Sequence, residues 1–474
     1  MRVLFASSEI DPLAKTGGLA DVASSLPKAL KKAGIEIFLI MPYYKKFVSK
    51  SGANIAPTDY LITVNIDDEK ISSRIYKTEL HGVEVFLVEN DELYDREQLY
   101  GTPEGDYPDN WKRFGYFAYA ILELSKLLGN IDLIHINDWQ TGLVPLLKLR
   151  KYPELKDTKT IITIHNLAYQ GLFEKEILHK LSIGMEDFTI DGLEYYGKVN
   201  FLKAGIVYSD FITTVSPTYA EEIQTPEFGY GLEGILRKRR DYIQGILNGI
   251  DYEVWNPSTD KELYKNFSKE DILEGKEANK IKLLEETGLK EPEKPLFGIV
   301  SRLAEQKGFD LFPPIIEEIA KRDINLVVLG AGDKVYQEMF INITKRYENI
   351  FVKIGFDPVL AKRIYASSNF FLMPSKYEPC GLGQLIAMRY GTIPVVRETG
   401  GLKDTVKDID EGGYGIVFKE YKPFELLNAI DRAINFYRDK SAFNKAVNYV
   451  ASLDFSWESS AKEYIKLYER VKHG

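Results

Sequence analysis

The first half of the chain alternates short apolar runs with segments in which apolar residues recur every three or four positions. Several of the runs stay apolar throughout, which is typical of strands that are covered on both faces. Strands that alternate with helices in this way predict a doubly wound parallel sheet of the α/β class. The predicted strands are Arg2–Ala6, Glu36–Ile40, Glu84–Val88, Leu133–Ile136, Thr160–Ile164 and Phe211–Val215.

A polar, charge-rich stretch over residues 258–294 interrupts this pattern and holds one expected helix, Lys276–Glu286. A second series of apolar strands follows it. The interruption predicts two domains, residues 1–247 and 248–456, followed by a last helix near Ser459–Val471. The strands of the second series are Leu296–Val300, Asn325–Leu329, Phe351–Ile354, Phe370–Met373 and Ile393–Val396.

Other segments show different periods. Apolar residues at helical spacing predict helices over Trp111–Leu128, Glu194–Val207 and Phe309–Ile319, the last with Pro313 and Pro314 in its first turn. Asp59–Thr78 alternates apolar and polar residues in places, which favours an antiparallel excursion from the sheet.

The two series begin alike, with a strand, a loop that carries lysine and glycine, and a helix. Lys15-Thr-Gly17 follows the first strand of one series, and Gln306-Lys-Gly308 follows the first strand of the other. Ligands of such sheets bind beyond the carboxyl ends of the strands. Two similar domains that face each other would therefore enclose a deep cleft between these loops.

Composition narrows the class of protein. A chain of 474 residues, 45% hydrophobic and 28% charged, has the length and content for two globular cores. The net charge of −9 argues against a broad nucleic-acid surface, and a single cysteine, Cys380, excludes an internal disulfide and a cysteine-rich metal cage. No signal-peptide core and no apolar run of membrane length is present, so we expect a cytoplasmic enzyme or binding protein without a membrane span.

The loop Lys15–Asp21 is the first candidate for chemistry. It lies between a predicted strand and a helix start, where unpaired N–H groups and the helix dipole attract anions. Gly17 and Gly18 let a ligand approach the backbone, and Lys15 adds a mobile positive charge. The plainer interpretation is a tight turn with a solvated lysine, and the loop alone does not decide between the two.

Cations and a carboxylate follow strands of the second series. Arg302 and Lys307 come just after a strand end, where a guanidinium fork and an ammonium suit a diphosphate whose charge grows as a bond breaks. Glu378 precedes a helix start that offers amides to a phosphate, and its carboxylate suits sugar hydroxyls. The alternatives are a pair of surface cations and a helix cap. Cys380 has no base beside it in its motif, so packing is favoured over a nucleophilic role.

Polar groups follow other strands as well. A second Thr-Gly-Gly-Leu, with Gly400 and Gly401, could supply amides to a diphosphate. His135–Gln140 and Ile164–Gly171 place polar side chains beside aromatic ones, the mixture that sugars require. The first strand is followed by neither Gly-x-Gly-x-x-Gly nor a Walker loop, and the Asp408-Ile-Asp410 turn fits a solvated loop better than a metal-held nucleotide. We therefore predict no metal and no cofactor.

Taken in order, six motifs resemble the bacterial glycogen synthase and plant starch synthase family. Each is modest evidence by itself, but the ordered set covers nearly the whole chain. The resemblance implies a GT-B fold, with two Rossmann-like domains and the active site between them. It also implies that the last helix, 457–474, crosses back to complete the first, acceptor-side domain, while the second domain binds the nucleotide sugar. The motifs are Lys15-Thr-Gly-Gly-Leu-Ala-Asp-Val22, His135 to Gln140, His165-Asn166, Leu247-Asn-Gly-Ile-Asp251, Ser301-Arg-Leu to Gln306-Lys-Gly308 and Glu378-Pro-Cys-Gly-Leu382.

The resemblance implies that glucose passes, with retention, from a nucleoside diphosphate to the non-reducing-end 4-hydroxyl of an α-1,4-glucan. His165 would then lie by the anomeric carbon, Arg302 and Lys307 would neutralise the departing diphosphate, and Glu378 would hold hydroxyls of the donor sugar. The other residues expected to contact donor or acceptor are Lys15, Gly17, Gly18, Asp21, Tyr94, Asp138, Asn248, Phe356, Cys380, Gly381, Leu382, Gly400 and Gly401.

Two positions depart from the family pattern. Gly383 stands where the family usually has threonine, which removes a hydroxyl near the phosphates. Ile386 stands where related retaining transferases carry a second glutamate for the ribose, an absence that many bacterial glycogen synthases share. Phe356 aligns with a common tyrosine and is a candidate to stack on the base. Because the motifs are of the bacterial and plant type, we expect ADP-glucose as the donor, with UDP-glucose as the alternative.

Three other functions are considered. A related retaining transferase could glucosylate a small acceptor, as sucrose-phosphate synthases do. A catalytically silent glucan-binding protein would be expected to have lost one of Lys15, Arg302, Lys307 and Glu378, and all four are present. A phosphorylase that uses pyridoxal phosphate is the most distant alternative.

Overall fold

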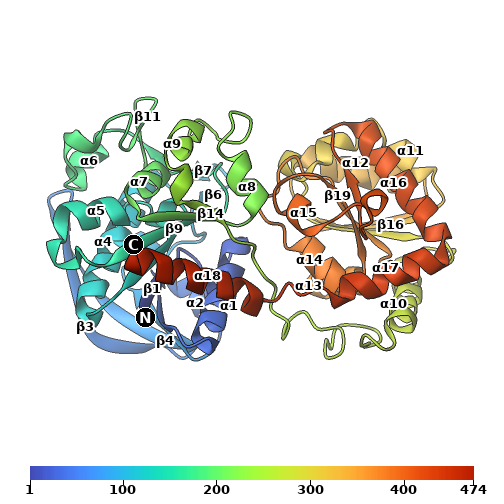
Figure 1. The fold of residues 1–474 in the computed structure, drawn as a ribbon, viewed down its shortest axis with the longest axis horizontal. Coiled ribbons are helices and arrows are strands. Elements are labelled where there is room, and N and C mark those ends of the chain that lie inside the picture. Colours follow the sequence, from blue (N-terminus) through green and yellow to red (C-terminus); the bar gives the residue numbers. More distant parts are fainter. The chain divides into compact units, whose positions relative to one another are not determined.

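The computed structural model describes residues 1–474, and the chain folds into two compact units (Figure 1). Unit 1 comprises Met1–Asn248 and Trp457–Gly474, and unit 2 comprises Gly249–Ser456. Each unit is built around its own sheet. None of the helices combines the length and the apolar composition that crossing a membrane would require.

The main sheet of unit 1 has nine strands, with β1 near its centre. From β1 the chain first builds one side of the sheet and then returns to build the other, so the topological switch point lies between β1 and β8. The antiparallel β3–β4 pair at one edge confirms the predicted excursion. In spatial order the strands are β14 (Ile243–Gly245), β13 (Phe211–Thr214), β9 (Lys159–Ile164), β8 (Leu133–Asn137), β1 (Arg2–Ala6), β2 (Glu36–Pro42), β5 (Val83–Val88), β4 (Glu69–Leu80) and β3 (Ala56–Ile66).

Helices cover this sheet, and α18, from the far end of the sequence, lies beside α1 (Figure 1, dark red beside blue). α18 is held by polar contacts as well as apolar ones, because the Tyr468 hydroxyl lies 2.6 Å from Nδ1 of His135 and Ser460 donates to the Leu247 carbonyl. The helices of unit 1 are α1 (Gly18–Lys32), α2 (Lys45–Val48), α3 (Asp91–Tyr94), α4 (Asn110–Leu128), α5 (Val144–Lys151), α6 (Ile177–Lys180), α7 (Phe201–Tyr208), α8 (Pro217–Glu222), α9 (Glu233–Lys238) and α18 (Trp457–His473).

The predicted helix Glu194–Val207 is wrong in its first half. Residues 194–200 form a hairpin of β11 (Glu194–Tyr195) and β12 (Lys198–Asn200), to which β10 (Leu172–Phe173) adds a third strand. Tyr196 and Gly197 both have positive φ, of 48° and 81°, which is the conformation of a two-residue hairpin turn. The helix begins only at Phe201. A further pair, β6 (Gly101–Thr102) and β7 (Gly105–Asp106), forms a second small hairpin.

The sheet of unit 2 has six parallel strands in the order of the Rossmann fold, with the switch point between β15 and β18. Its strands are β17 (Ile350–Ile354), β16 (Asn325–Gly330), β15 (Leu296–Val300), β18 (Phe370–Met373), β19 (Ile393–Arg397) and β20 (Ile416–Phe418). Its helices are α10 (Ile272–Thr287), α11 (Ile316–Ala320), α12 (Lys334–Thr344), α13 (Pro358–Ser367), α14 (Gly383–Arg389), α15 (Gly400–Thr405), α16 (Pro423–Arg438) and α17 (Lys440–Ser452).

The single helix predicted over Phe309–Ile319 is also wrong. Phe309–Leu311 forms one short helical turn, and α11 starts at Ile316. Pro313 and Pro314 lie between the two pieces, because proline lacks an N–H and also disfavours the helical conformation of the residue before it.

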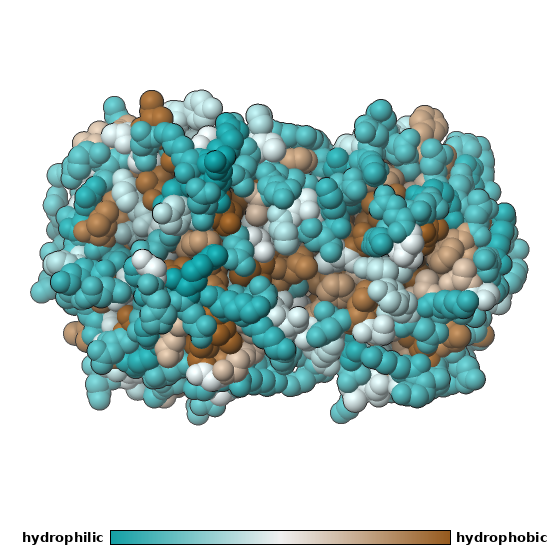
Figure 2. All heavy atoms as spheres, viewed as in Figure 1, coloured by the Kyte–Doolittle hydropathy of each residue, from teal (hydrophilic) through white to brown (hydrophobic).

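The face of the molecule seen in Figure 2 is mostly hydrophilic, with hydrophobic spheres scattered among polar ones. Scattered apolar side chains are normal on a protein surface and require no partner to cover them.

Candidate functional site

In unit 1, the candidate residues follow strands next to the switch point. The loop with Lys15 follows β1, Asp138 follows β8, and His165 follows β9. Because the three strands are parallel neighbours, their carboxyl ends share one edge of the sheet. These residues therefore lie at the edge of the sheet where ligands of doubly wound sheets bind.

The Lys15 loop is exposed and carries an ion pair of its own. Nζ of Lys15 lies 2.5 Å from a carboxylate oxygen of Asp21 and 3.9 Å from one of Asp11. Burial raises the pKa of Asp21, and the charge of Lys15 opposes that rise. Gly17 and Gly18 are exposed, and a Cβ added to either would meet no atom within 4 Å. Space for a ligand thus exists above both glycines.

Glu9 is a site residue that the sequence analysis missed. Its buried carboxylate accepts hydrogen bonds from the amide of Thr16 at 2.6 Å and the amide of Gly17 at 3.2 Å. The Gly17 N–H that was expected to contact the diphosphate is therefore already used inside the protein. Gly17 leaves room for a ligand but does not offer this amide to it.

Asp138 has a strained backbone. Its φ of 57° and ψ of −170° lie in a region used almost only by glycine, which costs about 1–3 kcal/mol. Its Oδ1 accepts a hydrogen bond of 2.8 Å from the amide of His165. Burial, and to a smaller degree the charge of Glu9, raises the pKa of Asp138 to about 7. Strain and a shifted pKa at a strand end are both typical of functional sites.

The ring of His165 is held as a neutral imidazole. Its Nε2 lies 2.8 Å from Oδ1 of Asn137, whose Nδ2 donates to the Ala6 carbonyl. Because that second bond orients the amide, Oδ1 is the acceptor and Nε2 of His165 carries the proton. Burial lowers the pKa of His165 to about 3. His135, by contrast, is fully buried between the hydroxyls of Thr163 and Tyr468 and is structural.

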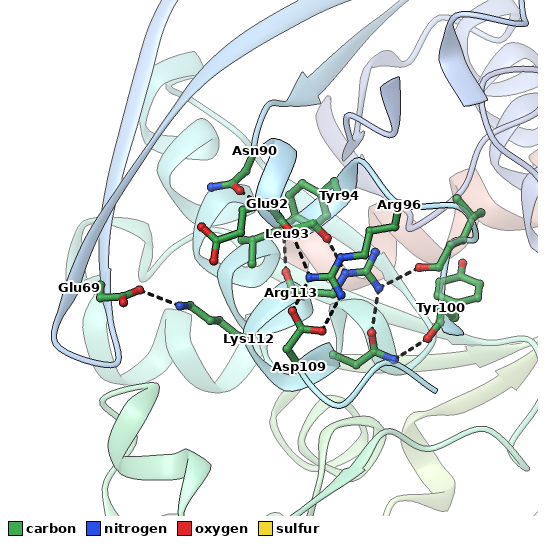
Figure 3. A network of polar contacts seen from close by, with 12 residues as sticks. Glu69, Asn90, Glu92, Leu93, Tyr94, Arg96, Tyr100, Asp109, Lys112 and Arg113 are labelled. Atoms are coloured by element: carbon green, nitrogen blue, oxygen red, sulfur yellow. Dashed lines mark hydrogen bonds and ion pairs between the residues drawn. The ribbon is translucent and has the colours of Figure 1, made fainter. Parts of the chain in front are cut away.

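Tyr94 and Asn248 are placed differently from the other candidates of unit 1. Tyr94 is fully buried, and its hydroxyl donates to the Arg113 carbonyl at 2.7 Å (Figure 3), so its side chain belongs to the core. Asn248 is buried at the end of the first segment of unit 1, and its Oδ1 has no hydrogen-bond partner. Asn248 thus has an acceptor without a partner, whereas the hydroxyl of Tyr94 is buried and its proton is already donated within the core.

In unit 2, Lys307 and Glu378 meet at the switch point. Nζ of Lys307 lies 2.8 Å from each carboxylate oxygen of Glu378, and Ser375 donates to the same carboxylate at 2.8 Å. Glu378 is buried, while Lys307 is partly exposed. Arg302 is exposed, and its guanidinium donates to the side chain of Gln306 at 3.1 Å. One cation is therefore fixed, and the other is free to reach a ligand.

Gly400 and Gly401 allow the loop after β19 to pack closely against the loop that carries Glu378. A Cβ at Gly400 would lie 1.9 Å from the Glu378 carbonyl oxygen, and one at Gly401 would lie 2.0 Å from the Cys380 carbonyl oxygen. The Gly401 amide donates to the Glu378 carbonyl at 3.0 Å. The amide of Gly401 is therefore satisfied internally, and the pair supports the loop that carries Glu378.

The rest of that loop is compact. Cys380 is buried and forms no disulfide, Gly381 has a φ of 76°, and Leu382 is half-buried. At Gly383 a Cβ would lie 3.0 Å from the ring of Phe371 and 3.3 Å from the sulfur of Met373. The side chains of Phe371 and Met373 thus leave little room for the usual threonine unless they shift.

The side chain of Phe356 is exposed to solvent, whereas that of Ile386 is buried. Phe356, just after β17, is 93% exposed, so its ring is open to a ligand. Ile386 is buried within α14, where it packs in the core of unit 2.

No group of three or more histidine, cysteine, aspartate or glutamate side chains is arranged to hold a metal ion. Asp408 and Asp410 instead pair with Arg432, at 2.5 and 2.6 Å.

Comparison with known proteins connects these features. The starch synthase catalytic domain family matches residues 2–238, and the glycosyl transferases group 1 family matches residues 281–448. A glycogen synthase of Geotalea uraniireducens (strain Rf4) is 47% identical over 478 residues, covering 99% of this chain and 98% of the relative. One of Aquifex aeolicus (strain VF5) is 48% identical over 476 residues, covering 100% of this chain and 99% of the relative. The chain belongs to the glycogen and starch synthase family.

A solved structure supports the same family assignment. The catalytic domain of starch synthase IV from Arabidopsis thaliana, bound to ADP and acarbose, matches with a TM-score of 0.91 and 35% identity. The match covers 100% of this chain and 99% of that chain. The two Rossmann-like sheets of this synthase-family chain are those of the GT-B fold of glycosyltransferases.

Proposed function

We propose that this chain is a glycogen synthase that transfers glucose from ADP-glucose to the non-reducing-end 4-hydroxyl of an α-1,4-glucan, with retention of the α configuration. The observation that carries the proposal is the full-length likeness to glycogen synthases at 47% and 48% identity. ADP is favoured as the nucleotide because the similar Arabidopsis starch synthase was solved with ADP bound. The cations and the carboxylate at the switch point of unit 2 fit a nucleotide sugar.

On the donor side, the residues of unit 2 have separate tasks. Arg302 and Lys307 neutralise the diphosphate as its charge grows, and Glu378, held by Lys307, accepts hydrogen bonds from glucose hydroxyls. The exposed ring of Phe356 stacks on the base. The compact loop from Cys380 to Leu382, with Gly400 and Gly401 behind it, shapes the pocket for sugar and phosphate.

Unit 1 presents the sugar and the acceptor. Lys15, Asp21 and the open space above Gly17 and Gly18 receive the donor. His165, Asp138 and the unpartnered Oδ1 of Asn248 line the sugar subsites. The low pKa of His165 keeps its ring neutral, so that the ring adds no positive charge beside a carbon that becomes cationic.

The proposed chemistry needs no protein nucleophile. The bond between C1 of glucose and the β-phosphate oxygen breaks while the acceptor O4 bonds to C1 on the same face, and the O4 proton passes to the departing phosphate oxygen. The backbone carbonyl of His165 steadies the positive charge that develops on C1. Positioning and electrostatic stabilisation then account for the rate.

The test is chain elongation on a glycogen primer with radiolabelled ADP-glucose or UDP-glucose as the donor. We expect faster incorporation from ADP-glucose, products that β-amylase digests, and the same rate after treatment with EDTA. Transfer to fructose 6-phosphate but not to maltooligosaccharides would instead identify a small-acceptor transferase. Equal or faster use of UDP-glucose would overturn the assignment of the donor.

A further inference from the structure

Glu9 is a buried carboxylate that forms no ion pair but accepts hydrogen bonds from two backbone amides and two hydroxyls. Its Oε2 accepts from the amides of Thr16 and Gly17, and its Oε1 accepts from the hydroxyls of Thr16, at 2.9 Å, and Tyr100, at 2.8 Å. Consecutive backbone amides that converge on one oxygen form a natural anion site. In this chain the anion that fills the site is part of the protein.

The residues that Glu9 holds lie between two proposed donor contacts. Thr16 and Gly17 connect Lys15 to Gly18, where α1 begins. Lys15 and Gly18 are exposed and available to a ligand, whereas the carboxylate of Glu9 is buried. Glu9 therefore fixes this loop from its inner side, without contact with a ligand on the outer side.

Tyr100 connects Glu9 to the interior of unit 1. Its hydroxyl donates to Glu9 and lies 2.7 Å from the hydroxyl of Ser8, and its backbone carbonyl accepts from Nδ2 of Asn110 at 2.9 Å. Oδ1 of Asn110 in turn accepts from Nη1 of Arg113 at 2.8 Å. A continuous chain of hydrogen bonds thus runs from Arg113 to the glycine loop.

Arg113 is a costly residue to bury, and its contacts show what it holds. The side chain is fully buried without a carboxylate partner, and it donates to the carbonyl of Leu93 at 2.6 Å (Figure 3). It also donates to the carbonyl of Leu99 at 2.9 Å, while its Nη2 has no hydrogen-bond partner. Removing a guanidinium from water costs several kcal/mol unless the new partners compensate. These bonds connect Arg113 to the backbone of the segment that ends at Tyr100.

We propose that Glu9 is a positioning residue of the donor site, which holds the backbone of Thr16 and Gly17 so that Lys15 and Gly18 meet the nucleotide sugar, and that Tyr100, fixed through Asn110 by Arg113, holds Glu9. The proposal rests on the proposed function for the identity of the donor. It is expected to affect catalysis because a displacement of about 1 Å in a positioning element can cost 100-fold in rate.

The experiment compares Glu9→Ala, Glu9→Gln and Tyr100→Phe in the full chain, with Glu97→Gln as the matched control. Glu97 is an exposed carboxylate of the same unit that pairs with Lys46, so its loss leaves the Glu9 network intact. The measurements are the dissociation constant of ADP by calorimetry, kcat and KM for ADP-glucose, the thermal midpoint, and deuterium uptake by a peptide that spans residues 10–20.

We expect Glu9→Ala to speed exchange in that peptide and to raise the ADP dissociation constant at least tenfold. Glu9→Gln, which keeps an acceptor for the two amides, should recover most of this loss, and Tyr100→Phe should give a smaller defect. Unchanged exchange, or a lowered thermal midpoint with normal ADP affinity in the folded fraction, would overturn the proposal.

The design separates this proposal from the proposed function. A wild-type chain that binds ADP but does not elongate glucans would refute the synthase, and the exchange and ADP affinity of the Glu9 variants would still decide the role of Glu9. A wild-type chain that does not bind ADP at all would overturn both.

Discussion

The ammonium nitrogen of Lys307 lies at the same distance, 2.8 Å, from both carboxylate oxygens of Glu378. This contact joins the loop after β15 to the loop after β18, the two strands that flank the switch point of unit 2. It places a positive charge beside the carboxylate that is proposed to hold the donor sugar, so a change in either residue affects both.

Lys307→Ala should mainly remove turnover. Loss of a charge that stabilises the departing diphosphate costs about 2.7–4 kcal/mol, which corresponds to a fall of about 100- to 1,000-fold in kcat. Initial rates with ADP-glucose and glycogen test this, with Lys345→Ala as the control because Lys345 is an exposed lysine of the same unit. Glucose transfer at the wild-type rate in Lys307→Ala would contradict the assignment.

Phe356→Ala should weaken donor binding and leave stability unchanged. The ring is 93% exposed, so its removal leaves no cavity, whereas stacking on a base contributes about 1–3 kcal/mol. We expect a rise of about five- to 150-fold in KM for the donor with little change in kcat. Phe424→Ala, which removes another exposed ring of unit 2, serves as the comparison and should leave KM unaltered.

His135 should make the protein sensitive to acid. Its folded pKa of about 3 lies below the usual value of 6.5, so below pH 6.5 the unfolded chain binds a proton that the native state excludes. The free energy of unfolding therefore decreases as the pH falls from 6.5 towards 3. At pH 5 the contribution of His135 to this decrease is about 2 kcal/mol. Urea unfolding at pH 7.5 and pH 5 should show a smaller loss in His135→Gln than in wild type; equal losses would argue against this origin.

Asp138 should have the opposite effect. Its folded pKa of about 7 lies above the value in an unfolded chain, so the native state binds the extra proton and stability falls as the pH rises from about 4 to 7. Asp138→Asn removes that penalty and should be more stable than wild type at pH 8, by up to about 4 kcal/mol. The same unfolding series tests this, and an Asn variant with no advantage at pH 8 would show that Asp138 ionises normally.

Gly308 should tolerate no side chain. Its φ is 84°, and a Cβ there would lie 2.0 Å from the Pro374 carbonyl oxygen. Gly412 has a similar φ, 74°, with nothing within 4 Å, so Gly412→Ala carries only the conformational cost of about 1–2 kcal/mol. Denaturant unfolding should find Gly308→Ala clearly less stable than Gly412→Ala, and similar losses would mean that the backbone of Pro374 can move away.

The sequence pattern predicted the fold well because long apolar strands and their order leave few alternatives. The predicted strands, the antiparallel excursion and the last helix lie where the pattern indicates them, whereas the short edge strands β14 and β20 were not predicted. The errors arose where local chemistry overrides periodicity. The Tyr196-Gly197 turn interrupts a segment with helical spacing, and the Pro313-Pro314 pair delays a helix.

The site was less predictable because several of its partners are distant in sequence. Glu9 shows no motif, and its role depends on Tyr100, 91 residues away. The strain at Asp138 is a property of the folded backbone, and no residue type indicates it. Tyr94 and the Gly401 amide were expected to face a ligand, yet both are hydrogen-bonded within their own units, which only the tertiary contacts reveal.

Helix α18 belongs to unit 1 but follows unit 2 in the sequence. During translation, the ribosome therefore completes all of unit 2 before the N-terminal half receives its last helix. Until then the imidazole of His135 lacks the hydroxyl of Tyr468, and the surface beside α1 stays uncovered. Unit 1 is therefore complete only when the whole chain has been made, and a gene split between the units would leave the first product without its last helix.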